Sequence, residues 1–463
     1  MKRNYENIYF LGIGGIGMSA LARYFLHEGY RVAGYDLTAT PLTRALESEG
    51  ALVHYEDDVN LIPEAMRMVE RTLVVLTPAI PYDHKEWAWF REQGFTIEKR
   101  SQMLGVLSEG KCVMAVAGTH GKTTTSTLAS WLNYAVAGEG SAFLGGISRN
   151  FGSNLVLGEG RRLVVEADEY DRSFLRLYPD VAVITATDAD HLDIYGTPEA
   201  MVEAFEQFAS QIKPGGALIL KQGVDLKFDV SERMLYRYSC DAGGDFYAEN
   251  ISLQEGGYYN YDIVLPDGRV EGCTLGILGK VHIENSIAAV AMLWCAAKIE
   301  GKSLDYDKLR KALREFEGVK RRMEVYVNTP EQVYIDDYAH HPEELRATIT
   351  SLRGIFPNRR LVAIFQPHLY TRTRDFAKEF AEVLSEADKV VMVPIYPARE
   401  LPIEGVTSEL IGRDITAEWE LVERDNVVEY LKRENTDITV TFGAGNIDVV
   451  CADVAKVITA KLK

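Results

Sequence analysis

The stretch that decides the fold is CVMAVAGTHGKTTTSTLASWL, residues 112–132. An apolar run of strand length precedes the glycine-containing segment 118–124, and a segment of helical character follows it. This order predicts a phosphate-binding loop, because glycines let backbone N–H groups and a helix N-terminus approach an anion closely. The common pattern G-x-x-x-x-G-K-[ST] also requires a glycine five positions before Gly121, where this chain has Val116.

The loop carries the side chains that a nucleoside triphosphate requires. Lys122 supplies a positive charge for phosphate oxygens, and Thr123 supplies a hydroxyl suited to Mg²⁺. The alternative is a glycine-rich turn with an incidental lysine, which the agreement of strand, loop and helix disfavours. The nucleotide-binding candidates in this segment are Gly118, Thr119, His120, Gly121, Lys122, Thr123 and Thr124.

Length and composition limit the class of protein. A chain of 463 residues is expected to form about three domains of roughly 150 residues each. The net charge is −18 and the basic residues are not clustered, so we expect no nucleic-acid partner. The apolar runs have strand length, so we expect neither a membrane span nor a secretory leader. Five cysteines without a CxxC pair are typical of reduced thiols in a cytosol.

A second glycine motif opens the chain. Gly12, Gly14 and Gly17 form G-x-G-x-x-G between a strand pattern and a helix pattern, and Asp36 ends the next strand. Such a loop binds the pyrophosphate of a dinucleotide or sugar nucleotide, and the acid can reach a ribose. By itself the motif is compatible with a pyridine-nucleotide oxidoreductase, or with a tight turn of any α/β sheet.

Acidic residues follow two later strand patterns. LVVEADEYD and VITATDADHLD each place carboxylates directly after an apolar run, and carboxylates packed in this way require a cation. The alternative for both is a solvated loop, and a lone histidine such as His191 is more often structural than a ligand. The residues concerned are Glu166, Asp168, Glu169, Asp171, Asp188, Asp190, His191 and Asp193.

The last part of the chain has polar residues at three further strand ends. VYIDDYAHHP, QPHLYTRTRD and FGAGNID all follow apolar runs, and ligands of open α/β sheets collect at the carboxyl ends of the strands. Each could equally be polar surface. The side chains of interest are Asp336, Asp337, Tyr338, His340, His341, His368, Arg372 and Arg374.

Strand and helix patterns alternate along the whole chain and predict an α/β fold. The rhythm weakens near residues 105–111 and again near 316–322. We therefore predict three domains, at residues 1–107, 108–322 and 323–463. The first and third are expected to be Rossmann-like, and the second is expected to be a P-loop-type ATPase domain with a mixed or parallel sheet.

In their order along the chain, these motifs resemble the Mur ligase family. The resemblance rests on GTHGKTTT, EADE, ADHLDIYGT, VKRRME, DDYAHHP and QPHLYTRTRD, and it covers nearly the whole chain. The family has its own shortened phosphate loop without the first glycine, which would account for Val116. GIGGIGMSALA and DHLDIYGT resemble the branch that joins L-alanine to UDP-N-acetylmuramate.

The resemblance implies an ATP- and Mg²⁺-dependent ligase of the bacterial cytoplasm that uses an acyl-phosphate intermediate. The three domains would bind the UDP-sugar, ATP, and the amino acid together with part of ATP. The partners would be UDP-N-acetylmuramate and L-alanine, and the protein would be a monomer or a weak homodimer. A ligase that recycles murein peptides shares the first substrate and is the second candidate.

The resemblance also implies roles for individual residues. The catalytic residues would be Lys122, Glu169, His191, Arg321 and Arg322. Thr123, Glu169 and His191 would bind Mg²⁺, and Asn285, Asp337 and either Arg321 or Arg322 would contact ATP. The substrates would be held by Gly12, Gly14, Gly15, Gly17, Met18, Ser19, Asp36, His340, His368 and Arg372.

Three segments depart from the family pattern. A lysine that many relatives modify to a carbamate is absent near Glu206, as it is in the alanine-adding branch. Val281 and His282 replace a His-Asn pair that touches adenine, and only Asn285 matches there. Leu369 stands where relatives often have arginine, which leaves more of the binding of the alanine carboxylate to Arg372.

Overall fold

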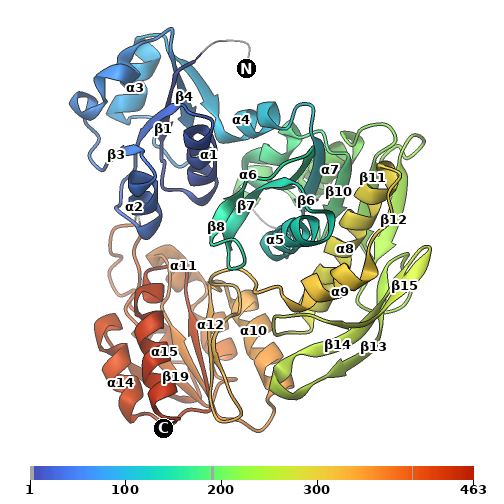
Figure 1. Cartoon of the computed structure of the whole chain (residues 1–463). Coiled ribbons are helices and arrows are strands. Elements are labelled where there is room, and N and C mark those ends of the chain that lie inside the picture. The colour runs from blue at the N-terminus through green and yellow to red at the C-terminus, as the bar shows by residue number, and fades with distance from the viewer. Residues whose placement is uncertain (1–4, 189–191, 399, 463) are drawn as a thin grey trace. The chain divides into compact units, whose positions relative to one another are not determined.

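In the computed structural model, which describes residues 5–188, 192–398 and 400–462, the strands form four sheets (Figure 1). The chain divides into two compact units. The first comprises residues 1–249, 262–273 and 284–316, and the second comprises residues 250–261, 274–283 and 317–463. The predicted α/β class is confirmed, while the three domain boundaries stay a prediction.

The N-terminal sheet is parallel, with strand order β3-β2-β1-β4-β5. All five residues of β1 are buried, as expected for a strand covered on both faces. Its strands are β1 (Asn7–Leu11), β2 (Arg31–Tyr35), β3 (Leu52–His54), β4 (Thr72–Leu76) and β5 (Thr96–Lys99). Its helices are α1 (Ile16–His27), α2 (Pro41–Ser48), α3 (Lys85–Glu92) and α4 (Arg100–Leu107), with short 3₁₀ turns at Val59–Leu61 and Glu64–Arg67.

The second sheet has the order β12-β11-β10-β6-β9-β7-β8. Its neighbouring strands are parallel except for β7 and β8, which form an antiparallel pair at one edge. β6 lies between β10 and β9, so the phosphate-loop stretch leaves the middle of the sheet. The strands are β6 (Cys112–Ala117), β7 (Ser141–Ser148), β8 (Ser153–Val156), β9 (Arg162–Glu166), β10 (Val181–Ile184), β11 (Ala217–Lys221) and β12 (Met234–Tyr238).

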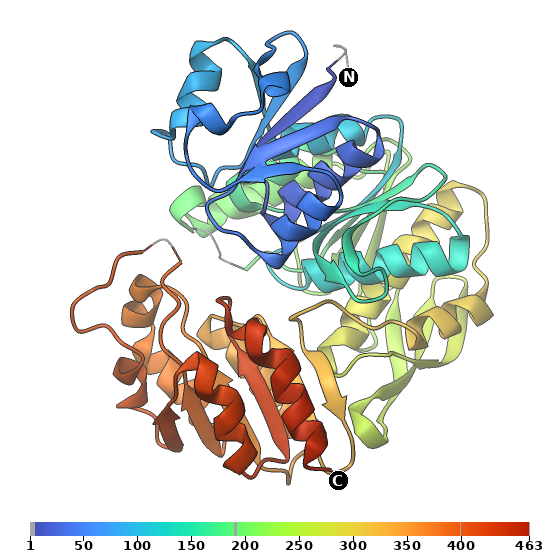
Figure 2. The ribbon, with the colours of Figure 1, turned by 60° about the vertical axis from the view of Figure 1, so that its left-hand side comes forward.

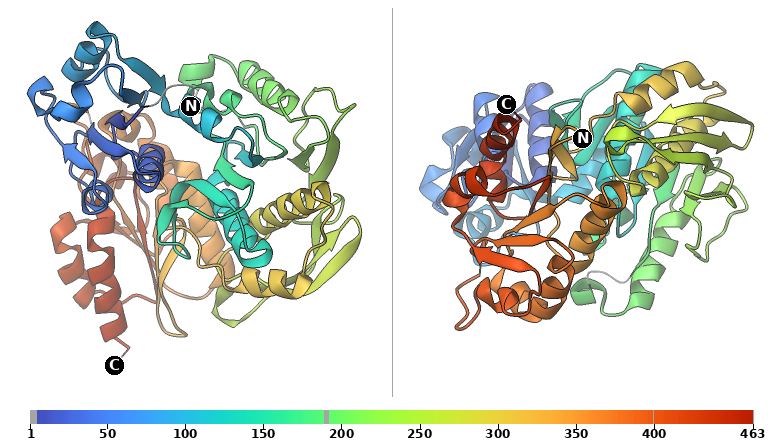
Figure 3. Two further views of the ribbon diagram at one scale, coloured as in Figure 1. Left: turned by 45° about the horizontal axis from the view of Figure 1, so that its top comes forward. Right: turned by 90° about the horizontal axis from the view of Figure 1, so that it is seen from below.

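Helices and short turns complete this part of the chain. Residues 285–297, within α8, are all buried, which fits the nearly uninterrupted apolar sequence of that segment. The α1 helix packs against the β7–β8 hairpin, as Figures 1 and 3 show. The helices are α5 (Lys122–Leu132), α6 (Leu192–Tyr195), α7 (Pro198–Ser210), α8 (Val281–Ile299) and α9 (Tyr306–Arg314), with a π turn at Asn133–Ala137 and a 3₁₀ segment at Tyr170–Arg176.

A small third sheet, absent from the sequence-based prediction, has the order β13-β14-β15. It is the yellow-green ribbon in Figure 1. Its strands alternate buried and exposed residues only in part, which makes them hard to recognise from the sequence. They are β13 (Tyr247–Leu253), β14 (Tyr259–Leu265) and β15 (Gly268–Thr274), with a 3₁₀ turn at Glu255–Gly257.

The fourth sheet has the order β16-β17-β21-β18-β19-β20, with β16 antiparallel at one edge and the other strands parallel. Helices α10 and α12 pack on one face, and α14 and α15 pack on the other, where Figure 2 shows them in red. The strands are β16 (Glu324–Asn328), β17 (Val333–Asp337), β18 (Leu361–Phe365), β19 (Lys389–Met392), β20 (Glu418–Leu421) and β21 (Ile438–Phe442). The helices are α10 (Pro342–Ile355), α11 (Tyr370–Asp375), α12 (Ala377–Leu384), α13 (Glu409–Gly412), α14 (Val427–Arg433) and α15 (Cys451–Ala460), with 3₁₀ turns at Arg424–Asn426 and Ile447–Val450.

One face of the N-terminal sheet buries a polar cluster. The Tyr9 hydroxyl donates to Oε2 of Glu86 (2.6 Å) and lies 2.8 Å from Nε2 of His54. Glu86 is fully buried in α3, and Asp57 accepts hydrogen bonds from the N–H groups of Lys85 and Glu86 at the start of this helix. Burial raises the pKa of Glu86 to about 7 and lowers the pKa of His54. The cluster therefore favours an uncharged Glu86 beside an uncharged imidazole.

This cluster generates a prediction about stability and pH. The pKa of Glu86 is raised on folding. Its contribution to the free energy of unfolding is therefore full below about pH 4.5 and is lost as the pH rises to about 7. The contribution of His54 has the opposite pH dependence. Because the pKa of His54 is lowered on folding, its contribution to the free energy of unfolding is lost as the pH falls below the pKa of the unfolded state. We expect Glu86→Gln to remove about 2 kcal/mol of the fall in stability between pH 5 and pH 8. Urea midpoints across this range measure the effect, with the exposed Glu64→Gln as the control. Parallel pH profiles for wild type and Glu86→Gln would contradict the prediction.

Candidate active site

The predicted phosphate loop joins β6 to α5. Gly118 has φ +127° and Gly121 has φ +78°, conformations that residues with a side chain rarely adopt. A Cβ atom on Gly118 would lie 2.2 Å from Oγ1 of Thr185 and 2.8 Å from the backbone nitrogen of Ala186. The N–H of Thr119 donates to the carbonyl of Ala186 (3.1 Å). The loop is thus held against the end of β10, and both glycines are required.

Val116 belongs to β6 and not to the loop. It is fully buried and is paired in register with Val183 on one side and Glu166 on the other. A glycine at this position would weaken a central strand without lengthening the turn. The departure from the common pattern therefore reflects a turn that begins at Gly118.

Lys122 begins α5 and its side chain turns back over the loop. Its Nζ donates to the carbonyl of Gly118 (2.6 Å) and to Oε1 of Glu169 (2.7 Å). Glu169 is fully buried, and burial raises the pKa of its carboxyl while Lys122 acts in the opposite direction. The ammonium group is therefore positioned at the centre of the loop by two acceptors.

Thr123 lies beside Glu166, the last residue of β9. The Thr123 hydroxyl donates to Oε1 of Glu166 (3.1 Å), and the Ser126 hydroxyl donates to its Oε2 (3.3 Å). A Cβ atom on Gly145 would lie 2.2 Å from the same carboxylate, so the neighbouring strand β7 leaves room for it only because this residue is glycine. The structure thus pairs the predicted metal-binding hydroxyl with Glu166, and pairs Glu169 with Lys122.

Of the other residues predicted to bind ATP or Mg²⁺, some lie at the loop and one lies outside the described residues. Oδ1 of Asn285 lies 3.0 Å from where a Cβ atom of Gly121 would be, so Asn285 contacts the loop. Nε2 of His120 lies 3.7 Å from Oδ2 of Asp188. Thr124 is buried. His191 lies outside the described residues, and within the described part of the chain no three His, Cys, Asp or Glu side chains form a metal-binding group.

The first glycine motif forms the expected loop between β1 and α1. Gly12 has φ +87°, and its N–H donates to the carbonyl of Tyr35 (2.8 Å). The N–H of Gly14 donates to Oδ2 of Asp36 (2.7 Å), and a Cβ atom on Gly14 would approach that oxygen to 2.8 Å. Asp36 therefore holds the loop directly, and a contact with a ribose stays a prediction.

Two predicted substrate residues on α1 face inward. Ser19 is fully buried, and its hydroxyl donates to the carbonyl of Ile16 (2.9 Å) and accepts from Nδ2 of Asn154 (3.0 Å). Met18 is also buried and lines the cavity described next. Ser19 therefore ties α1 to β8 and has its hydroxyl engaged within the protein.

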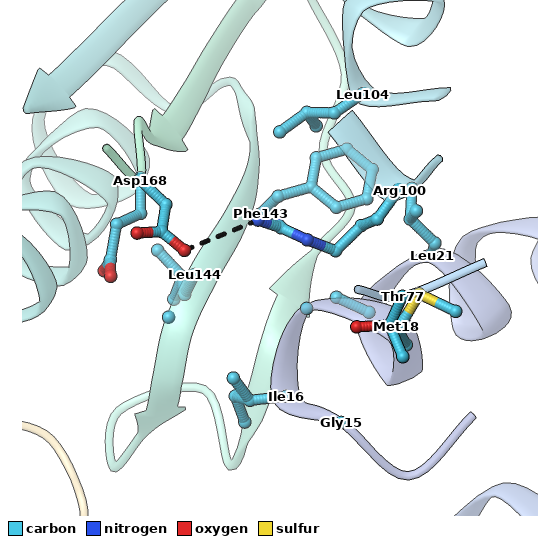
Figure 4. A pocket seen from close by; sticks show the side chains of 14 residues that line it. Gly15, Ile16, Met18, Leu21, Thr77, Arg100, Leu104, Phe143, Leu144 and Asp168 are labelled. Atoms are coloured by element: carbon cyan, nitrogen blue, oxygen red, sulfur yellow. Dashed lines mark ion pairs between the residues drawn. The ribbon is translucent and has the colours of Figure 1, made fainter. Parts of the chain in front are cut away.

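A cavity of about 240 Å³ lies between the first glycine loop, the middle of β7 and the end of β9 (Figure 4). Arg100 and Asp168 face each other across it, with Nη2 and Oδ2 3.6 Å apart. The cavity reaches Glu166, whose carboxylate accepts a hydrogen bond from Thr123 of the second glycine loop. Its walls are formed by Gly15, Ile16, Gly17, Met18, Ala20, Leu21, Thr77, Arg100, Leu104, Phe143, Leu144, Gly145, Glu166 and Asp168.

In the second unit, Arg321 is held by several acceptors. It has φ +61°, and its Nε donates to Oδ2 of Asp336 (3.2 Å). Its two Nη groups donate to the carbonyls of Gly445 and Gly443. The guanidinium therefore joins β17 to the turn after β21. Arg322 lies over the ring of Tyr338, with 5.4 Å between its Cζ and the ring centroid.

Asp337, at the end of β17, is also engaged within the unit. Its carboxylate accepts from the Thr348 hydroxyl (2.6 Å) and from the N–H of Ala339 (3.3 Å). Burial raises the pKa of Asp337 to about 6. A contact of this residue with ATP stays a prediction.

The structure brings together the three residues of the second unit predicted to bind substrate, of which His368 and Arg372 are expected to hold the amino acid. The rings of His340 and His368 are 6.0 Å apart, and Nη1 of Arg372 lies 3.5 Å from Nδ1 of His368. Burial, His340 and Arg372 lower the pKa of His368 to about 4, so this imidazole is neutral near pH 7. The ring of His368 stacks on Tyr396, with centroids 5.8 Å apart. Leu369 has the unusual φ of +71°.

Comparison with known proteins identifies the family. The model described as "Mur ligase family, catalytic domain" matches residues 7–111. "Mur ligase middle domain" matches residues 116–293, and "Mur ligase, glutamate ligase domain" matches residues 321–445. The chain belongs to the Mur ligase family.

Individual Mur ligases resemble it over nearly their full lengths. UDP-N-acetylmuramate–L-alanine ligase of Phocaeicola vulgatus is 47% identical over 447 residues, 96% of each chain. The crystal structure of UDP-N-acetylmuramate–alanine ligase from Thermotoga maritima has a TM-score of 0.81 at 26% identity, covering 98% of this chain and 99% of that one. A murein peptide ligase from Psychrobacter arcticus has a TM-score of 0.67 at 20% identity, covering 98% of both chains, and shows the shared fold.

The motif-based resemblance to the Mur ligases is therefore confirmed. Sequence reasoning named Glu166 among the acidic residues but did not select it, and it missed Ser126, Gly145 and Arg100. The available signal was register: Glu166 ends the strand that pairs with β6, directly beside the loop. No helix in the described part of the chain has the length and apolar character needed to cross a membrane.

The tight fit of Gly145 against Glu166 is testable. Gly145 has a backbone conformation that alanine can adopt, so Gly145→Ala adds only the clash with the carboxylate. We expect a loss of about 1 kcal/mol in unfolding free energy, because the Glu166 carboxylate must move away from the hydroxyls of Thr123 and Ser126. Thermal unfolding measures it, with Gly354→Ala as the control because a Cβ atom there meets nothing within 4 Å. Equal melting temperatures for both variants would contradict the fit.

Proposed function

We propose that this Mur ligase joins L-alanine to the lactyl carboxylate of UDP-N-acetylmuramate, with ATP as the energy source. The protein is an acid–amino-acid ligase of peptidoglycan precursor synthesis. The observation that carries this proposal is near-full-length similarity, at 47% identity, to a UDP-N-acetylmuramate–L-alanine ligase. A cavity that runs from the sugar-nucleotide-type loop to Glu166, the hydrogen-bond partner of Thr123 in the triphosphate-type loop, supports it.

The reaction explains why one chain has both loops. A carboxylate is a poor electrophile because its leaving group would be oxide. Attack of a carboxylate oxygen on the γ-phosphorus of ATP forms an acyl phosphate and releases ADP. The alanine amine then attacks the acyl carbon, phosphate leaves, and the amine loses a proton. Every species is anionic, so the site must neutralise charge where it develops.

The phosphate loop is suited to hold the β- and γ-phosphates. The positive φ values of Gly118 and Gly121 shape a turn whose N–H groups can face an anion. Lys122 is already positioned above this turn by the carbonyl of Gly118 and by Glu169. Its ammonium group would stabilise the negative charge that develops on the β-phosphate as ADP leaves.

The residues beside the loop fit Mg²⁺. Mg²⁺ prefers hard oxygen ligands, and the Thr123 hydroxyl and the Glu166 carboxylate present two such oxygens 3.1 Å apart. We therefore propose Thr123 and Glu166 as ligands, in place of the pair Thr123 and Glu169. Mg²⁺ bound there would neutralise negative charge on the transferring phosphoryl group. Glu169 would act through Lys122 instead.

The second unit supplies the proposed amino-acid site. Arg372 presents a guanidinium whose planar fork matches a carboxylate, and the neutral His340 and His368 lie beside it. Of the two arginines predicted to contact ATP, Arg322 is the better candidate. Arg321 is bound to Asp336 and two carbonyls and would position the turn after β21.

The other readings of the sequence are less well supported. A pyridine-nucleotide oxidoreductase would explain only the first glycine loop and would have no use for Lys122 and its neighbours. A peptide-recycling ligase shares the fold, but the solved example from Psychrobacter arcticus has a TM-score of 0.67, compared with 0.81 for the alanine ligase. It remains the alternative that the first experiment must separate.

The substrate assignment is tested by phosphate release from ATP with UDP-N-acetylmuramate and a panel of amines. We expect turnover with L-alanine and little with L-alanyl peptides, and UDP-N-acetylglucosamine should not replace the first substrate because it has no lactyl carboxylate. Lys122→Ala should abolish turnover while leaving UDP-sugar binding intact. Product formed with the peptide and not with alanine would favour the recycling ligase.

The proposed roles of Glu166 as a Mg²⁺ ligand and of Glu169 as the partner of Lys122 can be tested separately. We expect Glu166→Gln to raise the Mg²⁺ concentration needed for half-maximal turnover by about tenfold or more, because it removes a charged ligand. Glu169→Gln should lower kcat by releasing Lys122, with the Mg²⁺ requirement little changed. A Mg²⁺ titration of both variants decides between them, and a shifted requirement in Glu169→Gln alone would restore the original prediction.

A further inference from the structure

Arg100 stands where the first glycine loop faces the end of β9. It is the first residue of α4, and its guanidinium packs on Gly17 at the start of α1. A Cβ atom on Gly17 would lie 2.8 Å from Nη1 and 3.0 Å from Cδ of Arg100. The absence of a side chain at position 17 therefore gives the guanidinium its place against the loop.

The other side of the guanidinium faces a carboxylate. Nη2 of Arg100 lies 3.6 Å from Oδ2 of Asp168, as the dashed line in Figure 4 shows. Asp168 is itself held, because its Oδ1 accepts a hydrogen bond from the N–H of Tyr170 (3.1 Å). The Arg100 side chain is 23% exposed and that of Asp168 is 39% exposed, so both can be reached from the cavity.

The ion pair of Arg100 and Asp168 is one in which another anion can replace the carboxylate. At 3.6 Å and partly exposed, it contributes little to stability, since such pairs are weakened by solvent. A phosphate group offers the same guanidinium shorter, paired hydrogen bonds. An anionic ligand entering the cavity can therefore replace Asp168 as the partner of Arg100 at small cost.

We propose that Arg100 binds the diphosphate of the uridine diphosphate sugar, and that the diphosphate takes the guanidinium over from Asp168. The proposal rests on the proposed function, because it concerns the first substrate of the same site. The diphosphate is the group expected next to Gly17, since this glycine belongs to the loop that binds pyrophosphate. Arg100 would thus fix the end of the substrate from which the sugar extends towards Glu166.

A second anion of the substrate, the lactyl carboxylate, has similar chemistry and must be separated by experiment. UDP contains the diphosphate but lacks the N-acetylmuramate with its lactyl carboxylate, and uridine contains neither anion. The test is isothermal titration calorimetry of uridine, UDP and UDP-N-acetylmuramate with the full chain, without ATP. The variants are Arg100→Ala and Arg100→Lys, with Arg71→Ala as the matched control because Arg71 pairs with Glu6 on the surface of the same unit.

We expect Arg100→Ala to weaken UDP and UDP-N-acetylmuramate by the same factor, about ten- to hundredfold, as for a lost charge-assisted hydrogen bond. Uridine should bind equally to all variants. Arg100→Lys should recover part of the affinity, since it keeps the charge and loses the fork. Asp168→Asn should tighten UDP binding several-fold by removing the competing carboxylate, and this gain should shrink in the Arg100→Ala background.

Three results would overturn the proposal. Unchanged UDP binding in Arg100→Ala would do so, and so would a loss confined to UDP-N-acetylmuramate, which would assign Arg100 to the lactyl carboxylate. If the wild-type protein binds neither UDP nor UDP-N-acetylmuramate, the proposed function fails together with this inference. Wild-type melting temperature in Arg100→Ala, or in Arg100→Lys if the alanine variant unfolds, shows that a loss of affinity is local.

Discussion

The contact between the phosphate loop and the end of β10 is the constraint on which the rest of the site depends. Gly118 lies so close to Thr185 and Ala186 that no side chain fits, and the N–H of Thr119 is bonded to the carbonyl of Ala186. Because β6 is also paired with β9, the same turn is brought beside Glu166. Two strand pairings thus set the positions of the ammonium, the hydroxyl and the carboxylate.

The parts that could be predicted from the sequence are those set by local chemistry. Both glycine loops, the strand ends that carry polar residues and the α/β class follow from residue order and apolar runs. The cluster of His340, His368 and Arg372 was also accessible, because parallel strands place their carboxyl ends at one edge of a sheet.

The parts that could not be predicted depend on which partner each polar group finds. Glu166 and Glu169 are three residues apart and chemically alike. Only the register of β9 with β6 determines that Glu166 contacts Thr123 and that Glu169 contacts Lys122. Arg321 and Arg322 are adjacent, yet a positive φ turns Arg321 into a bond with Asp336. Ser19 looked available in the sequence and is engaged by Asn154 from a distant strand.

A chain with a net charge of −18 must still bind substrates that are themselves anions. In the first unit, Lys122 and Arg100 each lie next to a carboxylate, and the burial of that carboxylate determines how readily it can be exchanged for another anion. Glu169 is fully buried beside Lys122, so removing its partner would leave an unpaired charge in the interior. Asp168 is partly exposed beside Arg100, and water can solvate it when the guanidinium moves to another anion. The buried pair is therefore suited to permanent positioning at the triphosphate loop, and the exposed pair is suited to a ligand that must enter and leave.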